Sequence, residues 1–517
     1  MAMTRAIGDD ARPSRGPGSV ALLDGESRLP REILGNKGFG INLMRSLGLP
    51  VPPAFCLTTE VCAALLAGDE HALDRVWPDV LDKLRWLEDE TSRTFGRGPR
   101  PLLLSVRSGA AQSMPGMLDT VLDLGIDDAV DQALAMHTSV EFAADTRSRF
   151  EAMYRRIVLG EDSSAAVPDD PFVQLRGAVE AVFASWNSPR AVAYRAHHGL
   201  DGTGGTAVVV QAMVFGNHLR DSGTGVVFSR NPATGADAPL GEWLPGAQGE
   251  DVVSGTLDCL PLDALRTQQP GVFAELIAAA DQLERLGRDV QDVEFTVEEG
   301  RLWLLQTRVA KRSPQAAVRL ALKFRDAGLI DDAEALGRVT PDHVRALLSP
   351  ALQPETRLAA TLLAKGLPAS PGVVSGTAYT DVDAALDAAD ADEDVILVRT
   401  STSPDDVAGM LAARAIVTEI GGATSHAAVV SREIGLPAVV GCGAGVAAAL
   451  DGRVITVDGG EGAVFDGALE LTAWSEQDTP DLVELAAIAR RVLGDACETP
   501  LIAMLTAVQL AERSTDG

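Results

Sequence analysis

Aromatic and basic side chains are scarce in this chain. Of its 517 residues, 4% are aromatic, with 3 tyrosines against 50 glycines, and 44 lysines and arginines face 73 aspartates and glutamates. The formal net charge of −29 argues against nucleic acid or an anionic membrane as a partner, because both need a basic surface. It does not exclude phosphate chemistry, since a local pocket of cations can still hold a phosphate group.

Cysteines and long apolar runs are also few. No apolar run approaches the roughly 20 residues of a membrane span, and the N-terminus lacks the apolar segment of a secretory signal. We therefore expect a cytoplasmic protein. The cysteines are odd in number and lack CxxC spacing, so neither a disulfide framework nor a zinc site is expected. They are Cys56, Cys62, Cys259, Cys442 and Cys497.

Apolar runs separated by glycine- and proline-marked turns predict an α/β (α+β) multidomain chain. At roughly 150 residues per domain, the length suggests about three domains. We divide the chain into a disordered tail rich in Gly, Pro, Arg and Ser, a long region of mixed helices and strands, a proline-broken helical linker, a β/α domain and an Ala/Leu-rich helical tail. These parts are residues 1–18, 19–314, 315–365, 366–472 and 473–517.

Three local elements are predicted within the region 19–314, which the family resemblance given below implies is an ATP-binding region. Apolar runs on either side of residues 222–225 indicate a hairpin whose tip is Ser222-Gly223-Thr224-Gly225. Residues 270–287 have helical spacing. Residues 292–308 read as two strands joined by Glu-Glu-Gly.

The most informative segment surrounds His426. An apolar strand runs into Gly421 and Gly422, then Thr424, Ser425 and His426 follow, and a helix begins at once. The free N–H groups and positive dipole end of a helix N-terminus suit a phosphate group. A neutral histidine there could act as a nucleophile. The alternative is a histidine that only caps the helix, which the coincidence of strand, two glycines and Thr-Ser-His disfavours.

Residues suited to a triphosphate are spread over the first 310 positions. Binding ATP needs cations, flexible glycines and carboxylates for Mg²⁺. Asp292 and Glu294 alternate along a strand and share one face; Glu294 with Gln306 could hold Mg²⁺, and Arg308 could meet a phosphate oxygen. The 222–225 tip could close over phosphates. Each motif alone is ambiguous, because such residues are often solvated loop or edge positions. The remaining candidate cations are Lys37 and Arg107.

Two stretches carry a family resemblance. GGATSHAAVVSREIGLPAVVGCG resembles the phosphohistidine domain of pyruvate phosphate dikinases and phosphoenolpyruvate synthases. GNKGFGINLMRSLGLPVPPAFCLTTEVC, SVRSGAAQSMPGMLDTVLDLG and QDVEFTVEEGRLWLLQTR resemble the ATP-grasp domain of pyruvate phosphate dikinase. The resemblance implies an ATP-grasp region followed by a swivelling phosphohistidine domain. One departure is Ile420, where pyruvate phosphate dikinases usually have arginine, so the acceptor stays open.

The resemblance also implies roles for particular residues. His426 would carry the phosphoryl group, and Thr424 matches a regulatory phosphorylation site. Lys37, Arg107 and Arg308 correspond to phosphate-binding cations. The acidic and amide contacts to metal or nucleotide correspond to Asp292, Glu294 and Gln306.

The expected activity is an ATP-dependent phosphotransfer through His426. The family's enolpyruvate barrel needs about 250 residues, and only about 47 follow residue 470. With phosphate as co-substrate, AMP and pyrophosphate are expected, and pyruvate or another acceptor would bind outside the visible domains, for example on a separate barrel protein. The alternatives are a small-molecule dikinase with a non-pyruvate acceptor and a non-catalytic ATP-binding regulator. Whether 315–365 is a swivel or a fixed spacer is left open.

Overall fold

The computed structural model describes most of the chain. The described residues are 18–112, 114, 117–160, 164–197, 199–200, 204–218, 221–253, 259–349, 351–403, 406–472, 475–494 and 499–515. The predicted tail 1–18 lies outside them except for its last residue. Two compact units form, unit 1 (Met1–Ser46, Pro53–Ser113, Leu118–Met213) and unit 2 (Leu47–Pro52, Met114–Met117, Val214–Gly517). Their boundary lies within the region 19–314.

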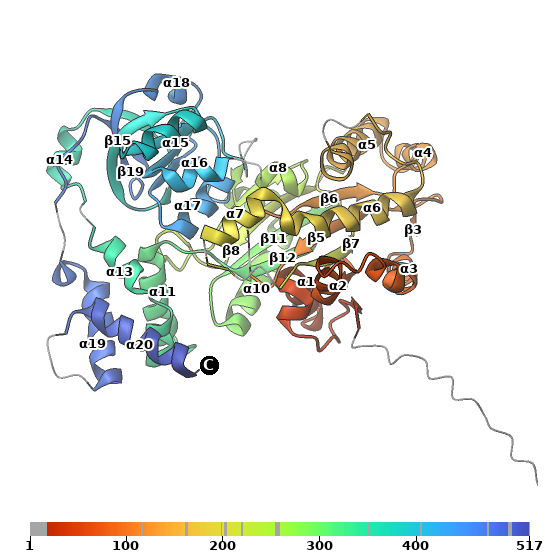
Figure 1. The fold of residues 1–517 in the computed structure, drawn as a ribbon, viewed down its shortest axis with the longest axis horizontal. Helices are drawn as coiled ribbons and strands as arrows, with labels where there is room; N and C mark the ends of the chain where they lie inside the picture. Colours follow the sequence, from red (N-terminus) through yellow and green to blue (C-terminus); the bar gives the residue numbers. More distant parts are fainter. Residues whose placement is uncertain are drawn as a thin grey trace, which may run out of the picture. The chain divides into compact units, whose positions relative to one another are not determined.

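Unit 1 is built on a five-stranded antiparallel sheet (Figure 1). In spatial order its strands are β1 (Val20–Leu22), β2 (Ala54–Leu57), β7 (Ala207–Ala212), β5 (Leu104–Gly109) and β6 (Thr120–Leu124). β2 and β7 are buried at every residue, which agrees with their nearly uninterrupted apolar sequences. Helices α1 (Arg31–Ser46) and α6 (Pro171–Ala184) pack on this sheet.

The other elements of unit 1 are short strands and helices around that core. They are α2 (Thr59–Leu66), α3 (Ala72–Thr91), β3 (Thr94–Phe95), β4 (Pro101–Leu102), α4 (Asp128–His137), α5 (Val140–Tyr154), a π-helix (Arg155–Leu159), a 3₁₀ turn (Ser185–Asn187) and α7 (Pro189–His197).

Helix α1 is interrupted at Gly35, which positions Lys37. Gly35 has φ 68° and ψ 165°, and a Cβ there would lie 1.6 Å from the carbonyl oxygen of Gly109. Only glycine accommodates both the backbone conformation and this approach. Beyond the break, Asn36 N–H donates to the Ala110 carbonyl at 2.9 Å, so the start of the second helical segment is fixed to the end of β5.

Unit 2 begins with a second antiparallel five-stranded sheet. Its order is β10 (Leu260–Pro261), β9 (Leu240–Pro245), β8 (Gly223–Phe228), β11 (Gln291–Glu298) and β12 (Arg301–Val309). β11 and β12 form the predicted hairpin, and Glu299 and Gly300 at its turn have φ of 51° and 75°, as a tight hairpin turn requires. The predicted helix 270–287 is confirmed as α10 (Pro270–Gly287). Two shorter helices are α8 (Gly249–Val253) and α9 (Asp263–Gln268).

The prediction that residues 222–225 form a hairpin tip is wrong. Gly223, Thr224 and Gly225 lie inside β8, and β7 belongs to the sheet of unit 1. A Cβ on Gly223 would lie 2.3 Å from the Trp243 ring. The hydroxyls are also engaged, since Thr224 Oγ1 donates to the Phe295 carbonyl at 3.1 Å and Ser222 Oγ accepts from Glu299 N–H at 2.9 Å. These glycines therefore serve close packing rather than a mobile lid.

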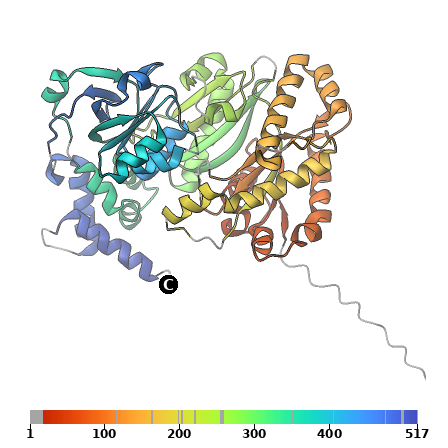
Figure 2. The same ribbon diagram turned by 45° about the horizontal axis from the view of Figure 1, so that its top comes forward.

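The C-terminal half of unit 2 contains a β/α domain with an eight-stranded sheet (Figure 1 and Figure 2). Its order is β13-β20-β19-β15-β16-β17-β18-β14, and β15, β16, β17 and β18 pair in parallel. One residue, Gly366, joins the two edge strands β13 and β14. The strands are β13 (Leu362–Lys365), β14 (Leu367–Ser370), β15 (Val373–Tyr379), β16 (Val395–Arg399), β17 (Ala415–Thr418), β18 (Ala438–Val440), β19 (Val454–Asp458) and β20 (Ala463–Asp466).

Four helices pack on this sheet. The buried side chains of α15 (Val382–Asp390), α16 (Val407–Ala412) and α17 (His426–Ile434) share one apolar cluster with the sheet, and those of α18 (Val446–Leu450) share another. The apolar strand expected before Gly421 and the helix expected from His426 are thus confirmed as β17 and α17. The helical assignment of residues 362–365 is wrong, because they form β13, which pairs with β20.

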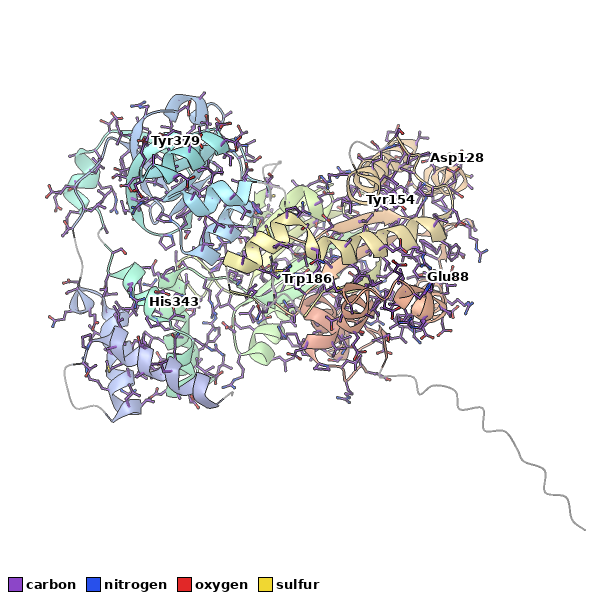
Figure 3. All side chains as sticks on the ribbon, in the orientation of Figure 1. Glu88, Asp128, Tyr154, Trp186, His343 and Tyr379 are labelled. Atoms are coloured by element: carbon purple, nitrogen blue, oxygen red, sulfur yellow. The ribbon has the colours of Figure 1, made fainter. Side chains whose placement is uncertain are left out.

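The linker and the C-terminal tail, treated separately in the sequence analysis, form one helical module. Helices α11 (Pro314–Asp326), α12 (Asp332–Gly337) and α13 (Pro341–Leu347) share a core with α19 (Pro480–Leu493) and α20 (Leu501–Thr515). His343, labelled in Figure 3, closes a capping box with Thr340 at the start of α13. The remaining elements are α14 (Pro354–Ala359) and a 3₁₀ turn (Glu476–Asp478). Of the described helices, none is long and apolar enough to span a bilayer.

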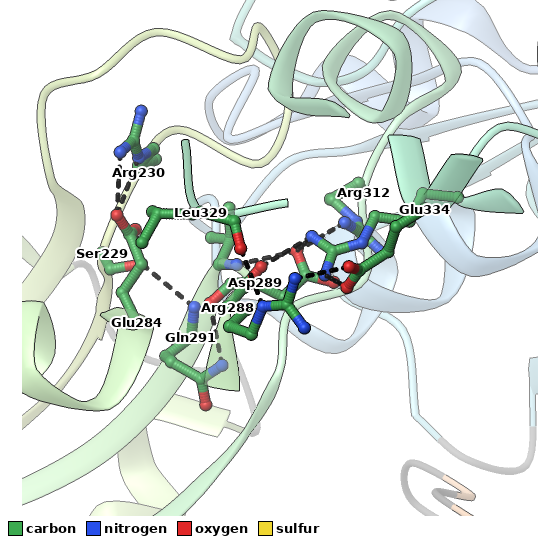
Figure 4. A network of polar contacts seen from close by, with 11 residues as sticks. Ser229, Arg230, Glu284, Arg288, Asp289, Gln291, Arg312, Leu329 and Glu334 are labelled. Carbon is green, nitrogen blue, oxygen red and sulfur yellow. Dashed lines mark hydrogen bonds and ion pairs between the residues drawn. The ribbon is translucent and has the colours of Figure 1, made fainter. Parts of the chain in front are cut away.

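A polar network connects this module to β11 (Figure 4). Asp289 Oδ1 accepts from Arg312 Nη1 at 2.6 Å, and Arg288 Nε donates to the Leu329 carbonyl at 2.7 Å. The core of the module also includes Phe228 and Val290 from the neighbouring sheet. The helices that follow β12 are therefore held against the sheet by both apolar packing and charge.

Replacing Gly225 by alanine should destabilise unit 2. The added Cβ would lie 2.3 Å from the Glu242 carbonyl oxygen and 2.6 Å from the Phe295 ring. Overpacking of this kind costs about 1–3 kcal/mol. Gly271→Ala is the matched control, because a Cβ there meets nothing within 4 Å. Urea unfolding followed by circular dichroism measures both, and an unchanged midpoint for Gly225→Ala would contradict the packing role.

Candidate active site

His426 is the first residue of α17, directly after a tight loop. β17 is buried at every residue and ends at Thr418. Gly421 has φ +125°, a value that glycine adopts readily, and Ser425, the N-cap, turns back so that its hydroxyl donates to the Gly422 carbonyl at 2.8 Å. The loop therefore delivers the imidazole to the end of the helix where free N–H groups and the positive dipole end lie.

The imidazole is buried and held through one nitrogen. Nδ1 lies 3.1 Å from Thr402 Oγ1, whereas Nε2 has no hydrogen-bond partner among the described residues. Burial lowers the pKa of His426 to about 4, and the negative charge of Asp406 offsets only part of this effect. The ring is therefore neutral at pH 7. If Nδ1 holds the single proton and donates it to Thr402, the lone pair is on Nε2.

Thr402 and Asp406 are residues that sequence reasoning missed. Both lie in the loop after β16, which pairs in parallel with β17, so the carboxyl ends of these two strands lie at one edge of the sheet. Asp406 is fixed by Ser403, whose N–H and hydroxyl donate to Oδ2 at 2.7 and 3.0 Å, and by Arg399 at 3.2 Å. The polar sequence TSTSPDD after the strand VILVR was the available signal.

The predicted acidic and amide residues meet on the β11–β12 hairpin. In the register of the two strands, Asp292 faces Arg308 and Glu294 faces Gln306. Arg308 Nε donates to Asp292 Oδ2 at 2.7 Å. Burial disfavours the charged form of Arg308, but the carboxylates of Asp292 and Glu294 outweigh this and raise its pKa. The sequence thus placed these four residues together correctly.

The same hairpin fits Mg²⁺ in its donor chemistry. Asp292 Oδ1 is buried without a hydrogen-bond partner among the described residues, and burial raises the pKa of this carboxyl. A cation at Oδ1 would offset that penalty, and carboxylate and amide oxygens are ligands that Mg²⁺ accepts. In the described part of the chain, no group of three or more His, Cys, Asp or Glu side chains is arranged for a metal ion. The candidate donors are the two carboxylates and the amide predicted from the sequence, Asp292, Glu294 and Gln306, which lie together in the strand register.

The two remaining predicted cations lie in unit 1. Arg107 is on β5, where its Nη1 donates to Gln211 Oε1 on β7 at 3.3 Å. Lys37 follows the break in α1. Gly109 lies two residues after Arg107, and a Cβ added to Gly109 would be 3.2 Å from the Cβ of Lys37. The structure therefore brings Lys37 close to the end of the strand that carries Arg107, in a different unit from Arg308.

Thr424 is buried and contacts a strand of the neighbouring sheet. Its hydroxyl donates to Glu242 Oε2 on β9. Gly422 lies against the same carboxylate, and a Cβ there would meet Glu242 Oε1 at 1.8 Å. The loop of His426 is thus in contact with the sheet that carries Asp292. Glu242 had no distinguishing signal in the sequence.

Comparison with known proteins identifies both parts. Residues 72–259 match the AMP/ATP-binding domain of pyruvate phosphate dikinase, and residues 391–462 match the mobile domain of PEP-utilising enzymes. The chain therefore combines a nucleotide-binding domain with a mobile domain of the PEP-utilising type. Over most of its length the chain is similar in sequence to pyruvate phosphate dikinases.

Three similar proteins, each named pyruvate, phosphate dikinase, illustrate the match. The protein of Clostridium symbiosum is 38% identical over 496 residues, covering 85% of this chain and 57% of that protein. That of Rhizobium meliloti (strain 1021) is 40% identical over 508 residues, covering 85% and 56%. The chloroplastic protein 1 of Oryza sativa subsp. japonica is 42% identical over 455 residues, covering 80% and 48%. The chain thus spans about half the length of these relatives.

The imidazole of His426 should remain neutral between pH 8 and pH 5. Its pKa of about 4 in the folded protein lies below the usual value near 6.5. Below pH 6.5 the unfolded chain binds this proton and the folded chain does not, so the contribution to stability is full above that pH and is lost as the pH falls toward 4. NMR titration of the ring Cε1–H resonance, assigned with His426→Asn, measures this. A midpoint near 6.5 would contradict it.

Proposed function

We propose that the chain is an ATP-dependent phosphotransferase that phosphorylates itself on Nε2 of His426. The observation that supports this most directly is a buried, neutral imidazole at a helix N-terminus, with Nδ1 held by Thr402 and Nε2 without a partner among the described residues. A catalytic nucleophile needs a lone pair at the reaction pH. A histidine that only capped the helix would not explain why Nε2 is buried without a hydrogen-bond partner among the described residues.

The proposed reaction begins with the lone pair of Nε2 attacking the β-phosphorus of ATP. The Nε2–P bond forms while the bond from the β-phosphorus to the α,β-bridging oxygen breaks. AMP leaves with that oxygen and the electron pair. The γ-phosphoryl then passes to inorganic phosphate, so that pyrophosphate leaves and one phosphoryl group stays on His426. The Nδ1 proton remains on the ring, hydrogen-bonded to Thr402.

Each part of the nucleotide site has a proposed role. Asp292, Glu294 and Gln306 would hold Mg²⁺, which neutralises phosphate charge when bound. Lys37, Arg107 and Arg308 would bind phosphate oxygens. Residues 222–225 contribute as the strand beside β11, which carries Asp292, and not as a closing lid.

The acceptor and the regulation belong to the same proposal. Pyruvate or another small molecule would take the phosphoryl group at a site outside the described domains, for example on a separate barrel protein in the cytoplasm. A phosphate on Thr424 would place negative charge against the Glu242 carboxylate and two residues from His426. Repulsion by Glu242 would then oppose the contact between this loop and β9.

Incubation with β-³²P-labelled ATP, Mg²⁺ and phosphate should label the wild-type chain with an acid-labile phosphoryl group. His426→Ala should abolish labelling because the nucleophile is removed. His71→Ala is the matched control, since His71 is exposed and lies in unit 1. A wild-type chain that binds ATP but gains no label and forms no AMP would refute the proposal.

Thr402→Val should slow labelling without abolishing it. Valine has the same shape as threonine but cannot accept the Nδ1 proton, so the productive tautomer loses one hydrogen bond worth about 0.5–1.5 kcal/mol. That corresponds to a roughly two- to tenfold lower rate at saturating ATP. Thr402→Ser, which keeps the hydroxyl, should label at nearly the wild-type rate. Equal rates for the valine and serine variants would show that the contact does not select the tautomer.

A further inference from the structure

Arg432 is a buried cation on the helix that begins with His426. Its side chain is bonded to two backbone carbonyls, with Nη1 donating to Ala369 at 3.1 Å and Nη2 to Ala423 at 2.7 Å. Nε has no hydrogen-bond partner among the described residues, and burial lowers the pKa of the guanidinium to about 10. The free-energy cost of desolvating this charge has to be offset by its hydrogen bonds and by neighbouring negative charges.

The bond to Ala423 ties this cation to the reactive loop. Ala423 precedes Thr424, and Arg432 and His426 belong to the same short helix. The guanidinium, the loop and the imidazole are therefore linked through one helix and one hydrogen bond. Wherever this loop carries His426, the charge of Arg432 goes with it.

The other side of Arg432 faces the sheet β10-β9-β8-β11-β12, here called the nucleotide sheet because it carries the proposed Mg²⁺ donors. Its guanidinium lies 5.7 Å from the ring centroid of Phe228 on β8. In the strand register Phe228 is directly opposite Asp292, which in turn faces Arg308. The negative charges of Asp292 and Glu242 stabilise the Arg432 cation, and the positive charge of Arg308 opposes it. Arg432 is thus electrostatically coupled to the residues proposed to hold Mg²⁺ and phosphate.

We propose that Arg432 carries a fixed positive charge into the nucleotide site together with the nucleophile His426, and that this charge stabilises the phosphoryl group during transfer. This inference rests on the proposed function. As the Nε2–P bond forms and the bond to the AMP oxygen breaks, negative charge is spread over the phosphoryl oxygens. A fixed cation nearby favours that state without changing its own protonation, because Arg432 keeps all its protons throughout.

Arg432→Gln should lower the rate of His426 labelling at saturating ATP by about 10²-fold, the usual effect of removing one preorganised electrostatic contact. The dissociation constant for Mg·ATP should be unchanged, because the nucleotide is bound by other residues. Arg432→Lys keeps the charge and should recover most of the rate. Arg414→Gln is the matched control, since Arg414 lies in the same domain with its side chain 62% exposed.

A second measurement separates this role from simple support of the loop. Phosphoramidate can phosphorylate a reactive histidine directly, without a nucleotide. Labelling of His426 by phosphoramidate should therefore be the same in the wild-type chain and in Arg432→Gln, and circular dichroism confirms that the variant is folded. A pure loop-anchoring role predicts that both labelling reactions fall together.

The outcomes are distinguishable. A selective loss of ATP-dependent labelling in Arg432→Gln, recovered in Arg432→Lys, supports the inference. Wild-type rates in Arg432→Gln, or parallel loss of both labelling reactions, would overturn it while leaving the proposed function intact. A wild-type chain labelled by phosphoramidate but not by ATP would overturn the proposed function and this inference together.

Discussion

The proposed chemistry of the β/α domain depends on the removal of His426 from water, which keeps its imidazole neutral. A histidine with its usual pKa would be partly protonated near neutral pH, and a protonated ring at a helix N-terminus would also meet the positive end of the dipole. Burial removes that charge, and Thr402 gives Nδ1 a partner. The same helix end that disfavours the imidazolium would favour a bound phosphoryl group, because its free N–H groups attract anions. One arrangement therefore suits both a neutral imidazole and the phosphorylated imidazole of the proposed reaction.

In the nucleotide sheet, by contrast, charged side chains are held away from water. Asp292 and Arg308 face each other across an antiparallel pair, so the strand register itself holds the two ions together. A slip of one strand by one residue would place Asp292 and Arg308 on opposite faces of the sheet. The glycines of β8 protect this register, because they let Trp243 stack on Phe295 with ring planes 3° apart and centroids 6.0 Å apart. The net charge of −29 does not prevent phosphate binding, because a phosphate group needs only a few cations, and the fold holds each of them at its own position.

The sequence predicted local structure well and distant contacts poorly. The hairpin carrying Asp292 and Glu294 and the helix starting at His426 were predictable, because turn residues and apolar periodicity lie next to the site itself. Thr402 was missed, because its contact with His426 exists only after two strands pair in parallel. Gly223 and Gly225 were assigned to a lid, since glycine next to an apolar run signals a turn as readily as tight packing. Residues 362–365 look helical in isolation and become a strand only by pairing with β20.

The helical module limits where the chain between the two sheets can bend. Helices α11 to α13 share a core with α19 and α20, and that core includes Phe228 and Val290 of the nucleotide sheet. Ion pairs such as Arg319 with Asp481, at 3.2 Å, join the first helix to the C-terminal ones. A packed core has few alternative arrangements, so it does not bend continuously. The connections to the β/α domain are different in kind, because Ala351 and Thr472 are joined by an isolated two-residue bridge with hydrogen bonds of 2.9 and 2.8 Å. A hinge at these two segments would disturb a few backbone bonds and the contacts of Thr424 and Arg432 with β9 and β8. Bending α11 to α13 would instead expose a core, so the short connections are where the structure accommodates rotation most easily.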